Sequence, residues 1–390
     1  MTGRHALILG AGVAGLSAAL MLGRAGWRTT VVEQAPSLRT DGYMIGLSGP
    51  GHRAAQRMGL LPALVPRARD IRENVYRDRR GRELLRVRYH DLLQGIDWIT
   101  LARTDLVEVL HASLDGSTAL RLGSTLADFV QEADGVRATL DDGTVLEADL
   151  LIGADGAHSA LRRMLFGPDG AAARPLGYRA AAFQIPDRHG LGEDFLSYAE
   201  PGRLSEVYTL ADGTLATLYA WRCTDTAPVP PAERRGTLRT AFAGTHPEAL
   251  GWIDDLPDGA PIYMDALTMI DLPAWSQGCA LLLGDAAHCL TLVSGQGAGM
   301  AMTSACVLAE ELAADGDVPA ALARHEARLR PAIARLQAHS ARNAAWFVPA
   351  TPMAFAVRNA AMRLLPRRLL ARWLLSAVRT EIRLAEAPAA

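Results

Sequence analysis

Lysine is absent from this chain of 390 residues, in which all 40 basic side chains are arginine. Enzymes that form a Schiff base, bind pyridoxal phosphate or use a P-loop need a lysine, so the sequence excludes these three classes. Acidic side chains number 42, and the resulting net charge of -2 does not favour nucleic acid as a partner.

Cysteine is scarce, and no pair has the C-x-x-C spacing of a zinc or redox site. The four cysteines are Cys223, Cys279, Cys289 and Cys306. This usage predicts a reduced, cytoplasmic protein with no metal site. Long apolar runs are also missing, because the N-terminal run is short and residues 343–357 are interrupted by prolines. We therefore expect neither a signal peptide nor an integral membrane segment.

The first elements follow the order strand, glycine turn, helix, strand. They are residues 6–9, the glycines Gly10, Gly12 and Gly15, residues 16–24 and residues 29–32. In such a turn the first glycine permits the sharp bend, the second lets the backbone approach a pyrophosphate, and the third lets the helix pack on the strand. Glu33 ends the second strand, where it can bind an adenosine ribose. The pattern predicts a dinucleotide site, and the acidic residue favours FAD or NAD over NADP.

Two further motifs have a similar form. Residues 152–162 and residues 283–288, the latter followed by 294–299, each begin as an apolar strand that ends in Gly and Asp and enters a helix. Either motif alone can be an ordinary turn with a capping aspartate. All three motifs in this order indicate a single cofactor site.

The hydrophobic pattern of the remaining residues predicts two groups of strands followed by a helical part. We expect a hairpin at 74–88, a helix at 103–113 with Thr104 as its N-cap, and strands within 119–146. A second group of strands surrounds one helix at 231–243; these strands are residues 178–185, 206–210, 215–221 and 262–270. A buried strand at 279–283 comes next, and the rest is helical, at 298–314, 319–347 and 366–385.

The three motifs resemble those of the single-component FAD-dependent monooxygenases of the p-hydroxybenzoate hydroxylase fold, the class A flavoprotein monooxygenases. The resemblance covers about residues 4–345, and residues 42–51 and 58–61 resemble the tetracycline-modifying and polyketide-tailoring branch. It implies an α/β fold (α+β overall) with a Rossmann-like FAD-binding domain built on a βαβ core. The expected domains are residues 1–174 with 276–316 for FAD, 175–275 as an antiparallel-sheet substrate domain, and 317–390 as a C-terminal helical segment.

The resemblance also implies which residues contact FAD. Gly10, Gly12 and Gly15 would hold the pyrophosphate and Glu33 the adenosine ribose. Arg39 and Arg103 would approach the ribityl and phosphate region, Asp285 the ribityl chain, and the backbone of Leu126 the adenine. The isoalloxazine edge would lie against Gly295, Gln296 and Gly297, and the further expected cofactor contacts are Ala14, Gln34 and Ala298. Asp155 belongs to a motif implicated in both FAD and NAD(P)H binding. The helix that begins near Ala298 would present its positive end to the reduced flavin.

The implied activity is NAD(P)H- and O₂-dependent oxygenation of an aromatic or polycyclic natural product through a flavin C4a-hydroperoxide, with FAD held non-covalently. A second glycine fingerprint is missing, so NAD(P)H is expected to bind transiently. We assign no catalytic side chain and no metal, and expect His158 and His288 to cap or pack. Tyr208 and Tyr219 are predicted pocket residues, with plain sheet packing as the alternative.

One departure from the family pattern leaves alternatives open. The family carries proline between His288 and Gly295, where this chain has Cys-Leu-Thr-Leu-Val at 289–293. A cyclase that holds FAD without redox chemistry therefore stays open, as do an isoprenoid reductase and a non-enzymatic flavin-binding protein. The substrate is not determined, and either a monomer or a homodimer is expected.

Overall fold

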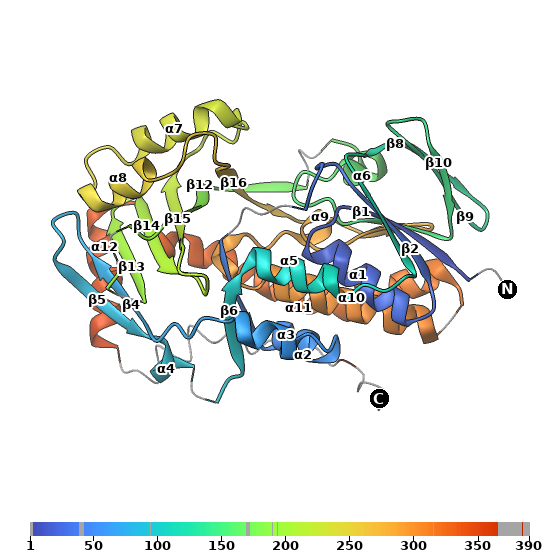
Figure 1. Ribbon diagram of the computed structural model, residues 1–390, viewed down its shortest axis with the longest axis horizontal. Helices are drawn as coiled ribbons and strands as arrows, with labels where there is room; N and C mark the ends of the chain where they lie inside the picture. The colour runs from blue at the N-terminus through green and yellow to red at the C-terminus, as the bar shows by residue number, and fades with distance from the viewer. Residues whose placement is uncertain are drawn as a thin grey trace.

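The computed structural model describes residues 3–38, 43–93, 95–168, 172–188, 190–192, 194–314, 316–365 and 384. Arg39 and all but Leu384 of the predicted helix at 366–385 lie outside these residues. Two lobes, each built on a large sheet, are joined along one side by two long helices, α10 (Gly297–Ala314) and α11 (Val318–Phe347) (Figure 1). The predicted α/β class is confirmed, with one large sheet that is mainly parallel and one that is mainly antiparallel.

The first lobe contains a six-stranded sheet with the strands that the motifs predicted. Its order is β17 (Ser276–Gln277), β18 (Ala280–Leu282), β11 (Leu150–Gly153), β1 (His5–Leu9), β2 (Arg28–Glu33) and β7 (Thr118–Leu122), and all neighbours except β17 and β18 are parallel. The carboxyl ends of β1, β11 and β18 therefore lie side by side. Ligands of open α/β sheets bind at this edge.

Helices cover this sheet and a smaller sheet extends it. The helices of the lobe are α1 (Val13–Arg24), α2 (Pro50–Arg57), α3 (Leu61–Leu64), α5 (Arg103–Ala112), α6 (Ala160–Phe166) and α9 (Asp285–His288), with 3₁₀ turns η1 (Val65–Arg67) and η4 (Leu292–Ser294). The smaller sheets are β8 (Leu126–Glu132), β9 (Gly135–Leu140) and β10 (Val145–Ala148), and the pair β3 (Met44–Ser48) and β6 (Trp98–Ala102).

The predicted N-cap of the helix at 103–113 is wrong. Helix α5 begins at Arg103, and its N-cap is Ala102, which has no side-chain cap and still has the extended conformation of β6. The chain passes directly from strand to helix, so Thr104 is already inside the first turn. Asp105 lies in that first turn, where a negative charge favours the helix.

The second lobe is built on a seven-stranded sheet. Its order is β16 (Tyr263–Ile270), β12 (Ala173–Ile185), β15 (Leu215–Arg222), β14 (Arg203–Thr209), β13 (Phe195–Glu200), β4 (Glu73–Arg77) and β5 (Glu83–Arg88). The predicted hairpin at 74–88 is confirmed as β4 and β5, but it belongs to this sheet, whereas the expected domain boundary at 174 placed it with the FAD-binding part. Local pattern does not reveal this, because β4 pairs in parallel with β13, far away in sequence.

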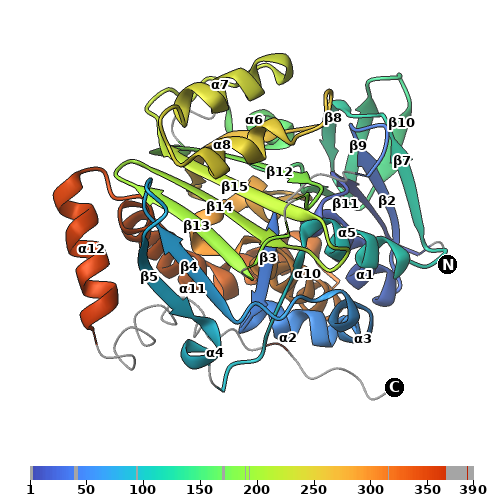
Figure 2. The ribbon, with the colours of Figure 1, turned by 60° about the vertical axis from the view of Figure 1, so that its left-hand side comes forward.

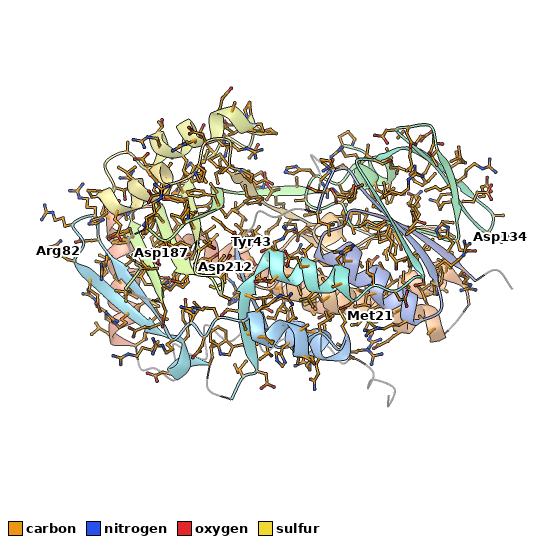
Figure 3. All side chains as sticks on the ribbon, viewed as in Figure 1. Met21, Tyr43, Arg82, Asp134, Asp187 and Asp212 are labelled. Carbon is orange, nitrogen blue, oxygen red and sulfur yellow. The ribbon has the colours of Figure 1, made fainter. Side chains whose placement is uncertain are left out.

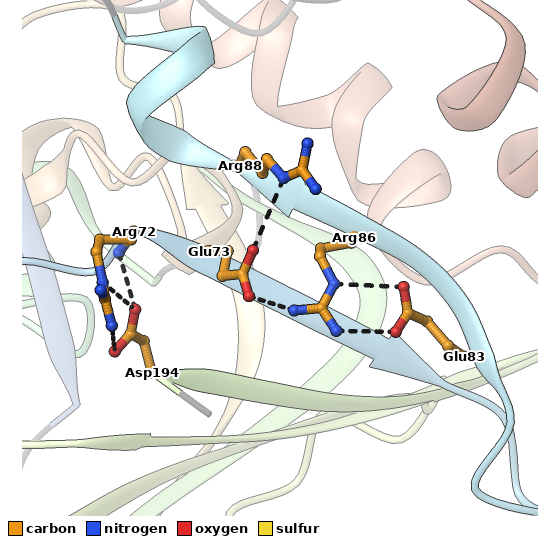
Figure 4. Close-up of polar contacts among 6 residues, drawn as sticks. All are labelled: Arg72, Glu73, Glu83, Arg86, Arg88 and Asp194. Atoms are coloured by element: carbon orange, nitrogen blue, oxygen red, sulfur yellow. Dashed lines mark hydrogen bonds and ion pairs between the residues drawn. The ribbon is translucent and has the colours of Figure 1, made fainter. Parts of the chain in front are cut away.

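Ion pairs link the two strands of the hairpin to each other and the start of β4 to the segment before β13 (Figure 4). The Arg86 guanidinium contacts Glu83, with Nη2 and Oε2 2.9 Å apart, and also Glu73. At the start of β4, Arg72 Nε lies 3.1 Å from Asp194 Oδ2, next to β13. These exposed pairs help to position the hairpin and contribute little to stability.

The two faces of the seven-stranded sheet pack differently (Figure 2). Its outer face is covered by α7 (Arg234–Ala241) and α8 (Pro247–Asp254), after the turn η3 (Pro231–Glu233). Its inner face meets the end of α11, α12 (Pro352–Leu364) and, near α4 (Tyr89–Leu92), strands β3 and β6 of the first lobe. The inner face thus adjoins the cofactor side of the molecule.

Candidate functional site

The glycine turn between β1 and α1 requires glycine for two different reasons. Gly10 has φ +100°, and a Cβ there would lie 2.5 Å from the Ala154 carbonyl oxygen; a Cβ on Gly15 would lie 1.9 Å from the Gly10 oxygen. At Gly12, however, a Cβ would meet no atom closer than Arg103 Nη2, at 3.8 Å. Packing within the chain therefore explains Gly10 and Gly15, whereas it leaves Gly12 unexplained, and the contact of Gly12 with a phosphate stays a prediction.

Glu33 supports this turn from β2. Its carboxylate accepts hydrogen bonds from the backbone N–H of Ala11, at 2.8 Å, and of Ala35, at 2.9 Å. The side chain is buried, while Gln34 beside it is exposed. Glu33 thus holds the turn in shape, and the contacts of Glu33 with a ribose and of Gln34 with the cofactor stay predictions.

The three motifs meet at one place. The Arg103 guanidinium lies over Gly12 and within electrostatic range of Asp285, and a Cβ on Gly297 would lie 3.8 Å from Asp285 Oδ1. Gly297 is the first residue of α10, and Gly284 packs so closely on Ala14 that a Cβ there would lie 2.8 Å from the Ala14 Cβ. The structure therefore brings the glycine turn, an arginine, a carboxylate and a helix N-terminus together. These groups can bind the phosphates and hydroxyl groups of a dinucleotide.

The Asp285 residue is exposed to solvent, yet the protein surrounds its carboxyl group closely enough to remove part of its hydration. Burial raises the pKa of its carboxyl group, whereas the Arg103 charge and a hydrogen bond from the Cys289 thiol act in the opposite direction. Burial and the Asp285 charge raise the pKa of Cys289, so this thiol stays protonated. Asp285 can accept hydrogen bonds from hydroxyl groups such as those of a ribityl chain.

The loop before α10 has an unusual backbone conformation. Thr291 has φ 60° and ψ 165°, a region that a β-branched residue rarely adopts. Among the described residues, its buried Oγ1 finds no hydrogen-bond partner. Gly295 is left-handed, and Gln296 Nε2 donates to Ser48 Oγ at 3.3 Å. Contacts of Gly295, Gln296, Gly297 and Ala298 with a flavin stay predictions.

The second motif has a structural role in this chain. Asp155 Oδ2 accepts the backbone N–H of Ala160 at 2.7 Å and so supports the start of α6, whose N-cap is Ser159. The buried Arg162 guanidinium donates to the Ala286 carbonyl at 3.0 Å and to the Ala157 carbonyl at 2.6 Å. It thereby connects the loop after β11 with α9. A cofactor contact of Asp155 stays a prediction.

The two histidines of the motifs differ in environment. His288 is buried against Trp275, with ring centroids 4.7 Å apart, and burial lowers its pKa to about 4. His158 is exposed, and its Nε2 lies 2.8 Å from Asp265 Oδ2 of β16. These contacts agree with packing for His288 and with a link between the lobes for His158.

Tyr43 and Tyr263 are candidate site residues that the sequence analysis missed. Their rings lie 5.9 Å apart, and Tyr43, labelled between the lobes in Figure 3, accepts the Arg103 N–H through its carbonyl oxygen at 3.1 Å. Burial raises the pKa of both phenols, and Asp285 adds to this effect. The tyrosine within the stretch 42–51, used for the resemblance, was the available signal.

The two predicted pocket tyrosines lie on opposite faces of the second sheet. The Tyr208 hydroxyl accepts the Met44 N–H on the inner face. Tyr219 packs under α8 on the outer face, where its hydroxyl donates to the Ala249 carbonyl at 2.5 Å. For Tyr219 these contacts favour the alternative of sheet packing. Leu126 is buried at the start of β8, so only its backbone could meet an adenine.

No cluster of metal-ligating side chains occurs in the part of the chain that the structure describes. Within the same residues, no helix is both long and apolar enough to cross a membrane.

Fold and site together define a flavoprotein with an FAD-binding parallel sheet. The family model described as FAD binding domain matches residues 4–335, and the chain belongs to this family. It is 32% identical over 332 residues to the aurachin C monooxygenase/isomerase of Stigmatella aurantiaca, covering 84% of this chain and 85% of that protein. It is 28% identical over 329 residues to a flavin-dependent monooxygenase of Legionella longbeachae, covering 83% and 84%.

Solved structures of flavoproteins have the same fold as this chain. The tetracycline destructase Tet(55) has a TM-score of 0.83 and 25% identity, with 99% of both chains covered. Klebsiella pneumoniae HpxO, in complex with FAD and uric acid, has a TM-score of 0.83 and 23% identity over 97% of this chain and 98% of that chain. The protein is thus an oxidoreductase of the flavin-dependent monooxygenase class with FAD as its cofactor.

Proposed function

We propose that the protein uses NAD(P)H and O₂ to hydroxylate or otherwise oxygenate an aromatic or polycyclic small molecule of natural-product biosynthesis. The observation that carries this proposal is the convergence of Gly12, Arg103 and Asp285 in front of α10. The likeness to an aurachin C monooxygenase/isomerase supports the substrate class. Bound FAD supplies the redox chemistry, since a flavin can accept a hydride from NAD(P)H and react with O₂.

The chain's own residues would bind and orient the cofactor. Gly12 leaves its backbone open to the pyrophosphate, and Arg103 offsets phosphate charge. Asp285 would accept hydrogen bonds from the ribityl hydroxyls and so help to orient the cofactor. The first N–H groups of α10 would stabilise negative charge on the bound flavin.

Other residues would control water. Tyr43 and Tyr263 stay neutral because burial disfavours their ionised forms, so they shield the site without adding charge. The Cys289 thiol also stays neutral, and it therefore does not act as a nucleophile toward the cofactor. We propose that residues 1–174 and 276–316 bind FAD, with the β4–β5 hairpin completing a substrate part at 175–275 and with 317–390 as a C-terminal segment.

The test has two steps. Purified protein is denatured and filtered, and the released flavin is identified; we expect FAD and no covalently attached flavin. Turnover is then measured with NADH or NADPH under ¹⁸O₂, using a panel of hydroxylated naphthalenes and quinolines. Label in the product supports the proposal. An unlabelled isomer formed without NAD(P)H would show a cyclase that only holds FAD, and NAD(P)H use without oxygen incorporation would show a reductase.

A further inference from the structure

The inner face of β14 carries a buried carboxyl group, Glu206, which has no part in the FAD site. Only 4% of the residue is exposed. Ser197 Oγ lies 3.0 Å from Glu206 Oε1 and 2.9 Å from Asn74 Oδ1. A serine hydroxyl has one hydrogen and can serve only one of these acceptors at a time. Ser197 and the Asn74 side chain both hydrogen-bond Glu206, and the two oxygens of an ionised carboxylate keep further lone pairs that can accept a hydrogen bond from another donor.

The groups that face Glu206 come from four elements. Arg358 of α12 is the cation among them, and the phenols are Tyr76 of β4, Tyr89 of α4 and Tyr208 of β14. Burial raises the pKa of Glu206 to about 7, while Ser197, Arg358 and Asn74 favour its ionised form. Both forms of the carboxyl group are therefore present near neutral pH.

Arg358 balances the charge but is occupied by aromatic rings. Its guanidinium lies 5.7 Å from the Tyr76 ring centroid and 5.1 Å from that of Phe355. The residue is 6% exposed, and its Nε finds no hydrogen-bond partner among the described residues. Arg358 thus lowers the cost of ionising Glu206 from a distance, without using the hydrogen-bonding capacity of the carboxylate.

Along β14, Glu206 is followed by a residue that contacts the segment next to the FAD site. Tyr208 follows two residues later on the same face, roughly 7 Å away along β14. The Tyr208 hydroxyl accepts the Met44 N–H, and the neighbouring Tyr43 lies within electrostatic range of Asp285.

A second connection runs across the sheet. Leu218 of β15 is the ladder partner of Glu206. Leu218 packs in the same inner-face cluster as Leu292, which belongs to the loop before α10. Both routes place Glu206 on the face of the sheet that is turned toward the cofactor.

We propose that Glu206 is the polar anchor of the substrate site and accepts a hydrogen bond from a hydroxyl or N–H donor of a neutral aromatic substrate. This assignment rests on the proposed function, because it specifies the substrate of the same reaction. It makes phenols, enols and ring N–H compounds the preferred class and disfavours carboxylates, which an ionised Glu206 repels. Glu206 is a specificity residue, because it binds the substrate at a distance from the reacting atoms.

The test uses the FAD-loaded protein and three matched probes: 1-naphthol, 1-methoxynaphthalene and 1-naphthoic acid. Their dissociation constants are read from the change in flavin absorbance. We expect 1-naphthol to bind roughly 10-fold or more tightly than the methyl ether, since the bond is made to a charged group. This preference should grow from about pH 6 to about pH 8, as Glu206 ionises through its pKa of about 7.

Two variants separate recognition from structure. Glu206→Gln keeps the shape and removes the charge, so the preference should fall to a few-fold and its pH dependence should disappear. Glu200→Gln is the control, because Glu200 is a buried carboxyl of the neighbouring strand that bonds Thr245 and Arg203 on the opposite face. It should leave the preference and its pH dependence unchanged. If Glu206→Gln loses FAD, Glu206→Asp serves instead and should weaken the preference but keep the pH dependence.

Three outcomes overturn the assignment: an unchanged preference in Glu206→Gln, tightest binding of 1-naphthoic acid by the wild type, or no spectral response to any of the three probes. The measurement needs FAD but neither NAD(P)H nor O₂. A failure of the oxygenase proposal therefore appears in the ¹⁸O₂ experiment and leaves the binding result readable.

Discussion

At the scale of the residue, Asp285 lies between two opposing influences, burial and the Arg103 charge. Replacement by Asn keeps the volume but removes the charge that accepts hydroxyl donors. We expect Asp285→Asn to weaken FAD binding about 10- to 100-fold, equivalent to about 1.5–3 kcal/mol for a hydrogen bond to a charged group. Titration of apoprotein with FAD, followed by flavin fluorescence, measures the change.

The control for this prediction is Asp258→Asn, which alters an exposed carboxylate that contacts Arg235 of α7 in the second lobe. It should bind FAD as the wild type does. Equal affinity in a folded Asp285→Asn protein would mean that Asp285 only shapes the start of α9.

Individual site residues differ in how far the sequence could predict them. Gly10 and Gly15 follow from local sterics, and Asp285 follows from its place at the end of a buried strand. Tyr43 could not be found this way, because its surroundings are formed by segments distant in sequence. The face of the sheet on which the Tyr219 side chain lies depends on the strand register, since a shift of the register by one residue moves every side chain of the strand to the other face.

At the scale of the element, α2 and α10 cross where Gly51 meets Gly299. A Cβ on Gly299 would lie 2.9 Å from the Gly51 Cα, so Gly299→Ala must push the helices apart. We expect a loss of about 1–3 kcal/mol in the free energy of unfolding, as for other overpacked sites. FAD retention should also fall, because α10 begins at the cofactor loop. Chemical denaturation with and without FAD measures both effects.

A helical glycine without neighbours provides the matched control. A Cβ on Gly236 of α7 would meet nothing within 4 Å. Gly236→Ala should therefore stabilise the protein by roughly 0.5–1 kcal/mol, the helix preference of alanine over glycine. If Gly299→Ala were also stabilising, the close crossing of α2 and α10 would be refuted.

Elements were predicted best where the chain pattern is local. The strands and helix of the glycine fingerprint, the β4–β5 hairpin and the long helices α10 and α11 match their predicted positions within a few residues. Helices α8 and α12 were missed, since α8 is short and the charge-free stretch at 343–357, which overlaps the start of α12, contains two prolines. Strand β13 was missed because its residues are buried on both faces and show no alternation.

At the scale of the whole molecule, stability should fall on acidification because of two buried histidines. Burial lowers the pKa of His288 to about 4 and that of His325 to about 3, from an ordinary value of 6.5. Below about pH 6.5 the unfolded chain takes up protons that the folded chain refuses. We expect the free energy of unfolding to decline by roughly 1.4 kcal/mol per pH unit for each histidine down to its folded pKa. Urea unfolding measured at a series of pH values between about 6.5 and 3 tests this expected decline in stability.

His288→Leu should reduce this acid sensitivity, since it removes one of the two titrating groups while keeping an apolar side chain against Trp275. Glu206 acts in the opposite direction: its raised pKa stabilises the fold fully below about pH 4.5 and ceases to do so as pH rises through about 7. A wild-type profile that stays flat between pH 6.5 and 4, with no difference from His288→Leu, would contradict the burial of neutral imidazoles.

The Arg162 guanidinium has a consequence for how this gene can vary. From α6 it bonds the Ala157 carbonyl in the loop after β11 and the carbonyl of Ala286 in α9, which is 124 residues from Arg162 along the chain. If two related genes recombine with a crossover between Arg162 and Ala286, the arginine comes from one parent and the backbone that accepts its hydrogen bond comes from the other. Chimeras with crossovers inside this interval should therefore lose cofactor more often than those with crossovers outside it, so the two segments should be inherited as a single block.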